Sequence, residues 1–112
     1  MTEGKAFIAG TSFENRKAKY NCQYSVPDGA TDIETGIVMS FDKATTLELG
    51  ADGARAFKAN KIGAQHEYSI VFNISDGNMG KTIYAKSYLT YTLNGETITV
   101  YSDQHNIQLK ED

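Results

Sequence analysis

Strict alternation of apolar and polar residues marks several stretches of the chain. In the clearest of them, residues 17–26, one face carries Ala18, Tyr20, Cys22, Tyr24 and Val26, and the other carries Lys17, Lys19, Asn21, Gln23 and Ser25. A period of two residues is typical of a strand with one buried face. Pro27-Asp28-Gly29 follows, and these residue types favour a turn. The pattern therefore predicts an antiparallel strand over 17–26.

The same pattern predicts further strands in the second half of the chain. Residues 66–74 place on the inner face Tyr68, Ile70, Phe72 and Ile74, and residues 82–93 place there Ile83, Ala85, Ser87, Leu89 and Tyr91. Asn94-Gly95 separates this strand from the β-branched run 97–102, and Asn-Gly between two such runs predicts a hairpin. We expect this last strand to continue through Ile107 and Leu109.

Weaker alternation predicts strands at 6–11, 33–41, 45–49 and 54–59. The alanine-rich stretch 50–64 is also compatible with a short helix. Three glycines bracket it, however, and no apolar stripe recurs every 3.6 residues, so we interpret it as loop plus a short strand. Seven or eight short strands separated by turn residues are typical of a β-sandwich. We therefore expect one all-β domain over residues 1–112.

The second half of the chain also matches the framework of a known module. The matching residues are Thr82-Ile83-Tyr84-Ala85-Lys86-Ser87-Tyr88-Leu89-Thr90-Tyr91, Asn94-Gly95 and Thr99-Val100-Tyr101-Ser102-Asp103, with weaker matches at 26–30 and 34–38. This set resembles the immunoglobulin-like or fibronectin type III-like modules of Gram-positive surface proteins and phage structural proteins, although Lys86-Ser87 departs from the usual Arg-Ala. The resemblance implies an antiparallel immunoglobulin/fibronectin type III-like β-sandwich of seven to eight strands, and it concerns framework rather than ligand-binding positions.

Charge and composition narrow the class of partner. The chain has 112 residues, a formal net charge of −3 and a pI of about 5.3, and no stretch concentrates its basic residues. Nucleic-acid-binding proteins carry a basic footprint, so we expect no nucleic-acid partner. No apolar run approaches the roughly 18 residues of a membrane span, so we expect no membrane insertion. The N-terminal residues lack the layout of a signal peptide.

Residue types that carry chemistry are few. Neither His66 nor His105 lies in a motif with serine or a carboxylate, and a general base needs such a positioned partner, so we expect both to be exposed polar residues. Cys22 is the only cysteine, which excludes an intrachain disulfide, and its alternating position predicts a small buried hydrophobe rather than a reactive thiol. We therefore predict that the protein is not an enzyme and has no catalytic residues.

The spacing of the acidic residues and of the glycines does not indicate a metal or cofactor site either. The acidic residues gather only at two turns, one with Asp28, Asp32 and Glu34 and the other at Asp76-Gly77-Asn78, and turn formation explains both more simply than calcium binding. The ten glycines are scattered and form no phosphate-binding loop. We predict no cofactor and no metal. Asn73-Ile74-Ser75 matches a glycosylation sequon within a predicted strand.

Tyrosine is the one residue type that suggests a binding surface. Tyr84, Tyr88 and Tyr101 fall on the faces opposite the inner ones in two strands predicted to form a hairpin, so we predict one exposed aromatic strip. Exposed tyrosines are enriched at interfaces, and the strip is then a partner-binding site. The competing interpretation, which ranks slightly ahead of a partner site, is cross-strand aromatic packing that stabilises the sheet.

These observations favour a structural or interaction module displayed on an outer surface. The leading hypothesis is a phage virion protein that decorates a capsid or tail, because the chain begins with methionine and shows neither an export signal nor a linker. The alternative is a spacer or adhesin module of a bacterial cell-surface, extracellular protein. A carbohydrate-binding module of a secreted hydrolase ranks lower, because tryptophan is absent. The expected partner is another structural or surface protein, with a glycan as the alternative, bound through the tyrosine strip and an edge strand.

Overall fold

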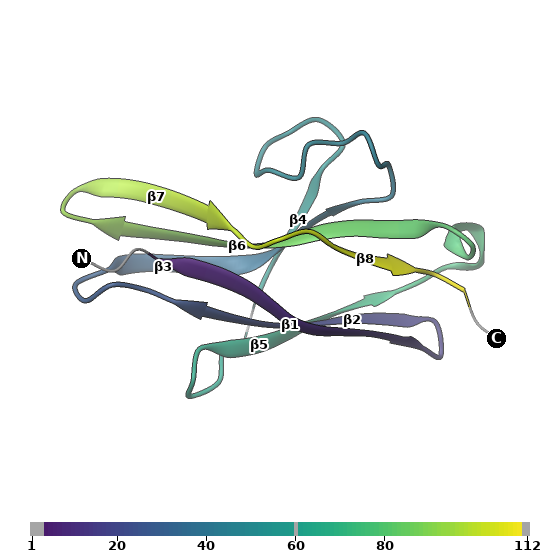
Figure 1. Ribbon diagram of the computed structural model, residues 1–112, viewed down its shortest axis with the longest axis horizontal. Coiled ribbons are helices and arrows are strands. Elements are labelled where there is room, and N and C mark those ends of the chain that lie inside the picture. Colours follow the sequence, from purple (N-terminus) through teal and green to yellow (C-terminus); the bar gives the residue numbers. More distant parts are fainter. Residues whose placement is uncertain (1–3, 60, 111–112) are drawn as a thin grey trace.

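Two antiparallel sheets make up the structure (Figure 1). A computed structural model describes residues 4–59 and 61–110. Within them, the elements are β1 (Lys5–Glu14), β2 (Lys17–Ser25), β3 (Thr31–Ser40), β4 (Arg55–Lys58), β5 (Glu67–Asn73), the 3₁₀ turn η1 (Asp76–Asn78), β6 (Thr82–Leu93), β7 (Glu96–Tyr101) and β8 (His105–Gln108). In this part of the chain, no helix is long and apolar enough to cross a membrane.

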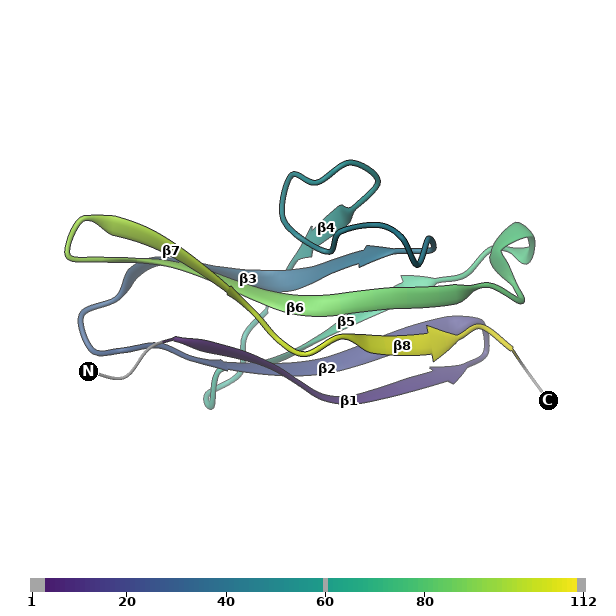
Figure 2. The same ribbon diagram turned by 45° about the horizontal axis from the view of Figure 1, so that its top comes forward.

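The strands divide between a small and a large sheet. The small sheet has the order β1-β2-β5, and the large sheet has the order β4-β3-β6-β7, with β8 also paired to β6. The two sheets lie one above the other as two layers (Figure 2). The fold is therefore an all-β sandwich of eight described strands, as the alternation pattern predicts.

The strands with the cleanest alternation lie where the sequence predicts them. β6 has the predicted bounds, and β2 and β5 end within one residue of theirs. The inner-face residues predicted for β6, namely Ile83, Ala85, Ser87, Leu89 and Tyr91, are all at most 2% exposed. Tyr20, Cys22 and Tyr68 from the small sheet are buried against them in the same core.

The strand predicted at 45–49 is wrong. These residues form turns and bends within the loop that joins β3 to β4. Leu47 is apolar for another reason than a place on a strand: it is buried from within the loop, outside the main core between the sheets. Val38 and Tyr88 are likewise buried outside that core, on the outer face of the large sheet. We infer that the loop folds over this face and buries a second, smaller cluster of Val38, Leu47 and Tyr88.

The last strand of the large sheet is interrupted. β7 pairs with Tyr88–Leu93 of β6, and β8 pairs with Thr82–Ala85. Between them, Ser102 N–H donates to the Ser87 carbonyl, and Ser87 N–H donates to the Ser102 hydroxyl, each at 2.9 Å. A serine side chain thus takes the place of a backbone carbonyl, and the predicted single strand becomes two. β1 begins toward one end of the longest dimension, 48 Å, and β8 ends toward the other (Figure 1).

Candidate functional site

The predicted tyrosine strip is only partly exposed. Tyr88 and Tyr101 are direct register partners on β6 and β7, and Tyr84 lies further along the same face of β6. Tyr84 and Tyr101 are half-buried, but Tyr88 is only 1% exposed, so its predicted exposure is wrong. We infer that the β3–β4 loop covers it, because Leu49 of this loop bonds to Tyr101, the register partner of Tyr88. Alternation within a strand carries no information about a covering loop. Whether Tyr84 and Tyr101 contact a partner stays a prediction.

Hydrogen bonds hold the β3–β4 loop on this face. Leu49 N–H donates to the Tyr101 hydroxyl at 2.9 Å, and the Ser40 hydroxyl donates to the Thr45 hydroxyl at 2.9 Å. The Tyr88 hydroxyl donates to the Glu34 carboxylate at 3.4 Å. Burial, and after it the negative charge of Glu34, raises the pKa of Tyr88 to about 12. Tyr88 is therefore a neutral structural residue at ordinary pH.

A buried polar network links the two sheets. The Thr35 hydroxyl donates to the Tyr88 carbonyl at 2.6 Å and lies 2.8 Å from the Tyr68 hydroxyl, which also donates to the Gly36 carbonyl at 3.1 Å. Cys22 lies beside this network, and burial raises the pKa of its thiol to about 12, partly offset by a hydrogen bond with Tyr68. The protonated, buried thiol agrees with the predicted hydrophobic role, because the thiolate is the reactive form.

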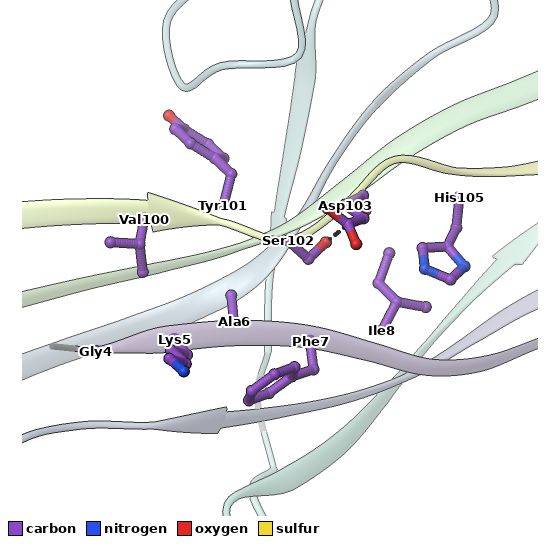
Figure 3. Close-up of a pocket in the computed structure, with 10 residues that line it drawn as sticks. All are labelled: Gly4, Lys5, Ala6, Phe7, Ile8, Val100, Tyr101, Ser102, Asp103 and His105. Carbon is purple, nitrogen blue, oxygen red and sulfur yellow. Dashed lines mark hydrogen bonds between the residues drawn. The ribbon is translucent and has the colours of Figure 1, made fainter. Parts of the chain in front are cut away.

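A first cleft of about 300 Å³ opens between β1 and the β7–β8 junction (Figure 3). Ile8 and His105 point toward one another across it, while Tyr101 points away from β1 (Figure 3). Ser102 lines the same cleft, but its hydroxyl accepts from Ser87 N–H and donates to the Asp103 carbonyl at 2.8 Å. This hydroxyl completes the strand pairing and is not arranged as a nucleophile.

The two histidines lie apart in the fold, one beside each sheet's own strands: His66 just before β5 of the small sheet and His105 at the start of β8 of the large sheet. His66 precedes β5, is exposed as predicted, and stacks on Tyr24 with ring centroids 4.6 Å apart. His105 begins β8 and is half-buried rather than exposed, because it faces the first cleft. Its carbonyl accepts a hydrogen bond from the Tyr20 hydroxyl at 3.2 Å. Within residues 4–59 and 61–110, no three His, Cys, Asp or Glu side chains gather as metal ligands.

A second cleft of about 340 Å³ lies at the opposite edge of the sandwich, between β4 and β5, and the prediction from sequence missed it. Phe57 of β4 and Phe72 of β5 meet edge to face there, with ring centroids 4.8 Å apart. Phe41 and Met39 complete its apolar lining, and Arg55 lies at its rim. One signal was present in the sequence: Val71 is an apolar residue on the otherwise polar face of β5.

Comparison with known proteins identifies no relative. No protein-family model, no curated protein and no solved structure significantly matches this chain.

Proposed function

We propose that this chain is a non-catalytic interaction module built on a sandwich of the immunoglobulin/fibronectin type III kind. The strand order supports the fold: in immunoglobulin constant-type sandwiches, the first, second and fifth strands share one sheet, and the third, sixth and seventh share the other. The same two groups occur here; β4 differs, because it pairs with β3 instead of β5, and β8 is an additional strand that pairs with β6.

The observation that carries the proposal is the state of the two open edges of the sandwich. Each edge has unpaired strands beside a cleft of about 300 or 340 Å³, and the described sheets do not close into a barrel. Three large apolar side chains beside these clefts are exposed, namely Phe7 at 46%, Phe57 at 38% and Val71 at 48%. An unpaired edge next to an apolar cleft offers main-chain hydrogen bonds for affinity and a pocket for specificity.

The residue types that chemistry would need have structural roles, and this supports a non-catalytic module. The Ser102 hydroxyl completes strand pairing, and the Cys22 thiol is buried and protonated. His66 stacks on Tyr24.

The setting rests on the sequence resemblance to phage structural and Gram-positive surface modules. We propose that the chain decorates a phage capsid or tail and that its partner is another virion protein. In the alternative setting, a bacterial cell surface, the same edges bind a surface protein as part of an adhesin or spacer.

Quantitative mass spectrometry of purified particles, cell envelope and cytosol from the source culture tests this proposal. We expect the chain to co-sediment with particles and to cross-link to a shell or tail protein. Enrichment in the envelope supports the alternative setting. Recovery in the cytosol without a cross-linked protein, or substrate turnover that is lost on changing His66 or His105, contradicts the proposed function.

A further inference from the structure

One side of β5 is used by its neighbour in the sheet. Tyr24 N–H donates to the His66 carbonyl at 3.1 Å, and Ile74 N–H donates to the Arg16 carbonyl at 2.8 Å. Both bonds join the even-numbered residues of this segment to the β1–β2 hairpin. Successive residues of a strand direct their backbone N–H and C=O groups to opposite sides. The odd-numbered residues of β5 therefore direct theirs away from β2.

The other side of β5 is open along most of its length. Gly63 N–H donates to the Glu67 carbonyl at 2.7 Å, so the β4–β5 connection covers the first residue of this edge. No described strand pairs with the rest of the edge. Ser69, Val71 and Asn73 thus direct three N–H donors and three C=O acceptors outward, with the spacing of an unpaired edge strand.

The second cleft lies beside this open edge, and its lining suits the apolar side of an incoming strand. Val71, Phe72 and Asn73 of β5 line one wall, and Phe57 of β4 lines the other. Among the described residues, the exposed large apolar side chains number five, and three of them, Phe57, Ile62 and Val71, lie in β4, in β5 or in their connection. An added strand would place alternate side chains in the cleft and would cover Val71 with its other face.

The strand order shows where the small sheet ends. In the constant-type sandwich the fourth strand pairs with the fifth. Here β4 pairs with β3 over Met39–Gly36, so the small sheet ends at β5 with three strands. A strand from outside would be the fourth strand of this sheet.

The side chains around the open edge of β5 are mainly basic, and this favours an acidic segment as the bound strand. Lys17 and Lys19 are exposed on the outer face of β2, in register with Asn73 and Val71, and Arg55 lies on the cleft rim. Lys81 approaches from the other end, where its ammonium lies 5.6 Å from the Phe41 ring centroid. Three acidic residues are near: Glu14, the register partner of Lys17, Asp76, which pairs with Arg16, and Glu67, the first residue of β5. The basic side chains outnumber them in a chain whose net charge is −3.

A second copy of this chain is a poor occupant for the same reason. β5 of another copy carries one acidic residue, Glu67, and brings its own Lys17, Lys19 and Arg55, so it would add positive charge around the new strand pair instead of compensating it. A strand that carries several acidic side chains would instead compensate the positive charge around this edge.

We propose that the open edge of β5 at Ser69, Val71 and Asn73 binds an extended segment of a partner protein in which apolar side chains, seated in the Phe57–Phe72 cleft, alternate with acidic ones. This inference rests on the proposed function as an interaction module, and it specifies the partner chemistry. The bound segment adds a fourth strand to the small sheet through main-chain hydrogen bonds.

The test uses the full chain and two capped synthetic peptides, Glu-Val-Glu-Phe-Glu-Val-Glu and the same sequence with lysine for glutamate. Affinity is measured by isothermal titration, and amide hydrogen exchange is followed by NMR. We expect the glutamate peptide to bind at least tenfold more tightly than the lysine peptide. We also expect it to slow amide exchange at Ser69, Val71 and Asn73. Equal affinities, no binding, or protection confined to the β1 or β7 edge would overturn the proposal.

A proline substitution tests the backbone contact directly. Val71→Pro removes one outward N–H without breaking the β2–β5 pairing, because proline is tolerated where the N–H faces an open edge. We expect it to weaken the glutamate peptide at least tenfold, whereas the matched control Val71→Thr, which keeps the N–H, changes affinity less than threefold. If Val71→Pro fails to fold, the surface change Arg55→Glu replaces it, with the peptide preference expected to fall at least tenfold. An unchanged preference in the folded variant, or dimerisation of the free chain through β5, overturns the proposal.

Failure of this inference and failure of the proposed function give different results. If the chain co-sediments with particles or envelope and Val71→Pro does so equally, the module function stands and the β5 edge is not its contact. If the glutamate peptide binds at β5 but the chain associates with neither fraction, the edge proposal stands and the proposed setting fails.

Discussion

Gly36 allows β4 to lie against β3, and its replacement by alanine is the sharpest test of how tightly the sandwich is packed. Gly36 is buried opposite Lys58 of β4. A Cβ at this position would overlap the Phe57 carbonyl oxygen and would lie 2.9 Å from the Phe57 carbonyl carbon and 3.0 Å from Lys58 Cα. All three atoms belong to the backbone, so no side-chain rotation relieves the contact. We expect Gly36→Ala to push β4 away from β3.

The expected magnitude follows from overpacking, which typically costs about 1–3 kcal/mol in a well-packed site. Alanine also reduces the conformational entropy of the unfolded chain, which offsets about 0.4–1 kcal/mol. Gly10→Ala is the matched control, because a Cβ there meets nothing within 4 Å and the effect on the unfolded chain is the same. We therefore expect Gly10→Ala to be neutral or slightly stabilising and Gly36→Ala to be less stable than it by about 1–3 kcal/mol.

Urea unfolding followed by circular dichroism gives the free energies, and amide exchange over Arg55–Lys58 locates the change. Faster exchange confined to β4 is the expected pattern in Gly36→Ala, because β4 pairs with β3 alone. Equal stability of the two alanine variants, with unchanged exchange in β4, would refute the reasoning.

Three further predictions concern side chains with a defined structural role. Ser87→Ala should raise the free energy of unfolding by about 1 kcal/mol, because the Ser87 hydroxyl is fully buried and has no hydrogen-bond partner among the described residues; a loss of stability in urea would contradict this. Burial raises the pKa of the Cys22 thiol from 9.0 to about 12, so the thiol ionises at lower pH in the unfolded chain than in the folded chain. Its contribution to the free energy of unfolding is therefore complete below pH 9 and is lost as pH rises through about 12. Cys22→Ala should therefore flatten the alkaline decline of stability by about 2 kcal/mol between pH 9 and 10.5, and a slope equal to that of the unsubstituted chain would count against this. Tyr101→Phe removes the acceptor of the Leu49 N–H, so amide exchange at Leu49 should accelerate severalfold while exchange in β6 is unchanged; equal exchange at Leu49 would show that the loop is held by other contacts.

Strands with one buried face could be predicted from the sequence because burial on one face leaves a pattern of period two. β2 and β6 show this most clearly, since nearly every second side chain in each is buried. The break before β8 could not be predicted from alternation, because it depends on one hydroxyl that replaces a backbone acceptor; Ser102-Asp103, residue types that are common in turns, were only a weak local sign of it.

The surfaces were harder to predict than the strands, because they depend on segments far apart in the sequence. Tyr88 alternates as an outward residue and is nevertheless buried, which we attribute to the β3–β4 loop that bonds to its neighbour Tyr101. The second cleft arises because β4 pairs with β3, which leaves Phe57 facing Phe72 across an open edge. No local pattern specifies which sheet a four-residue strand joins, so neither the cleft nor the open edge of β5 follows from alternation alone.

The start of β1 and the end of β8 point toward opposite ends of the molecule, and this arrangement has a mechanical consequence. A force that pulls these two points apart loads β1 and β8 along their lengths, so the hydrogen bonds of each strand resist in shear. β1 has nine register pairs with β2, whereas β8 has four with β6. The shorter strand is therefore the weaker element, and the Ser102 junction separates it from β7, which keeps six pairs with β6. Under such tension, β8 would yield first and lengthen the molecule while the sandwich stays closed.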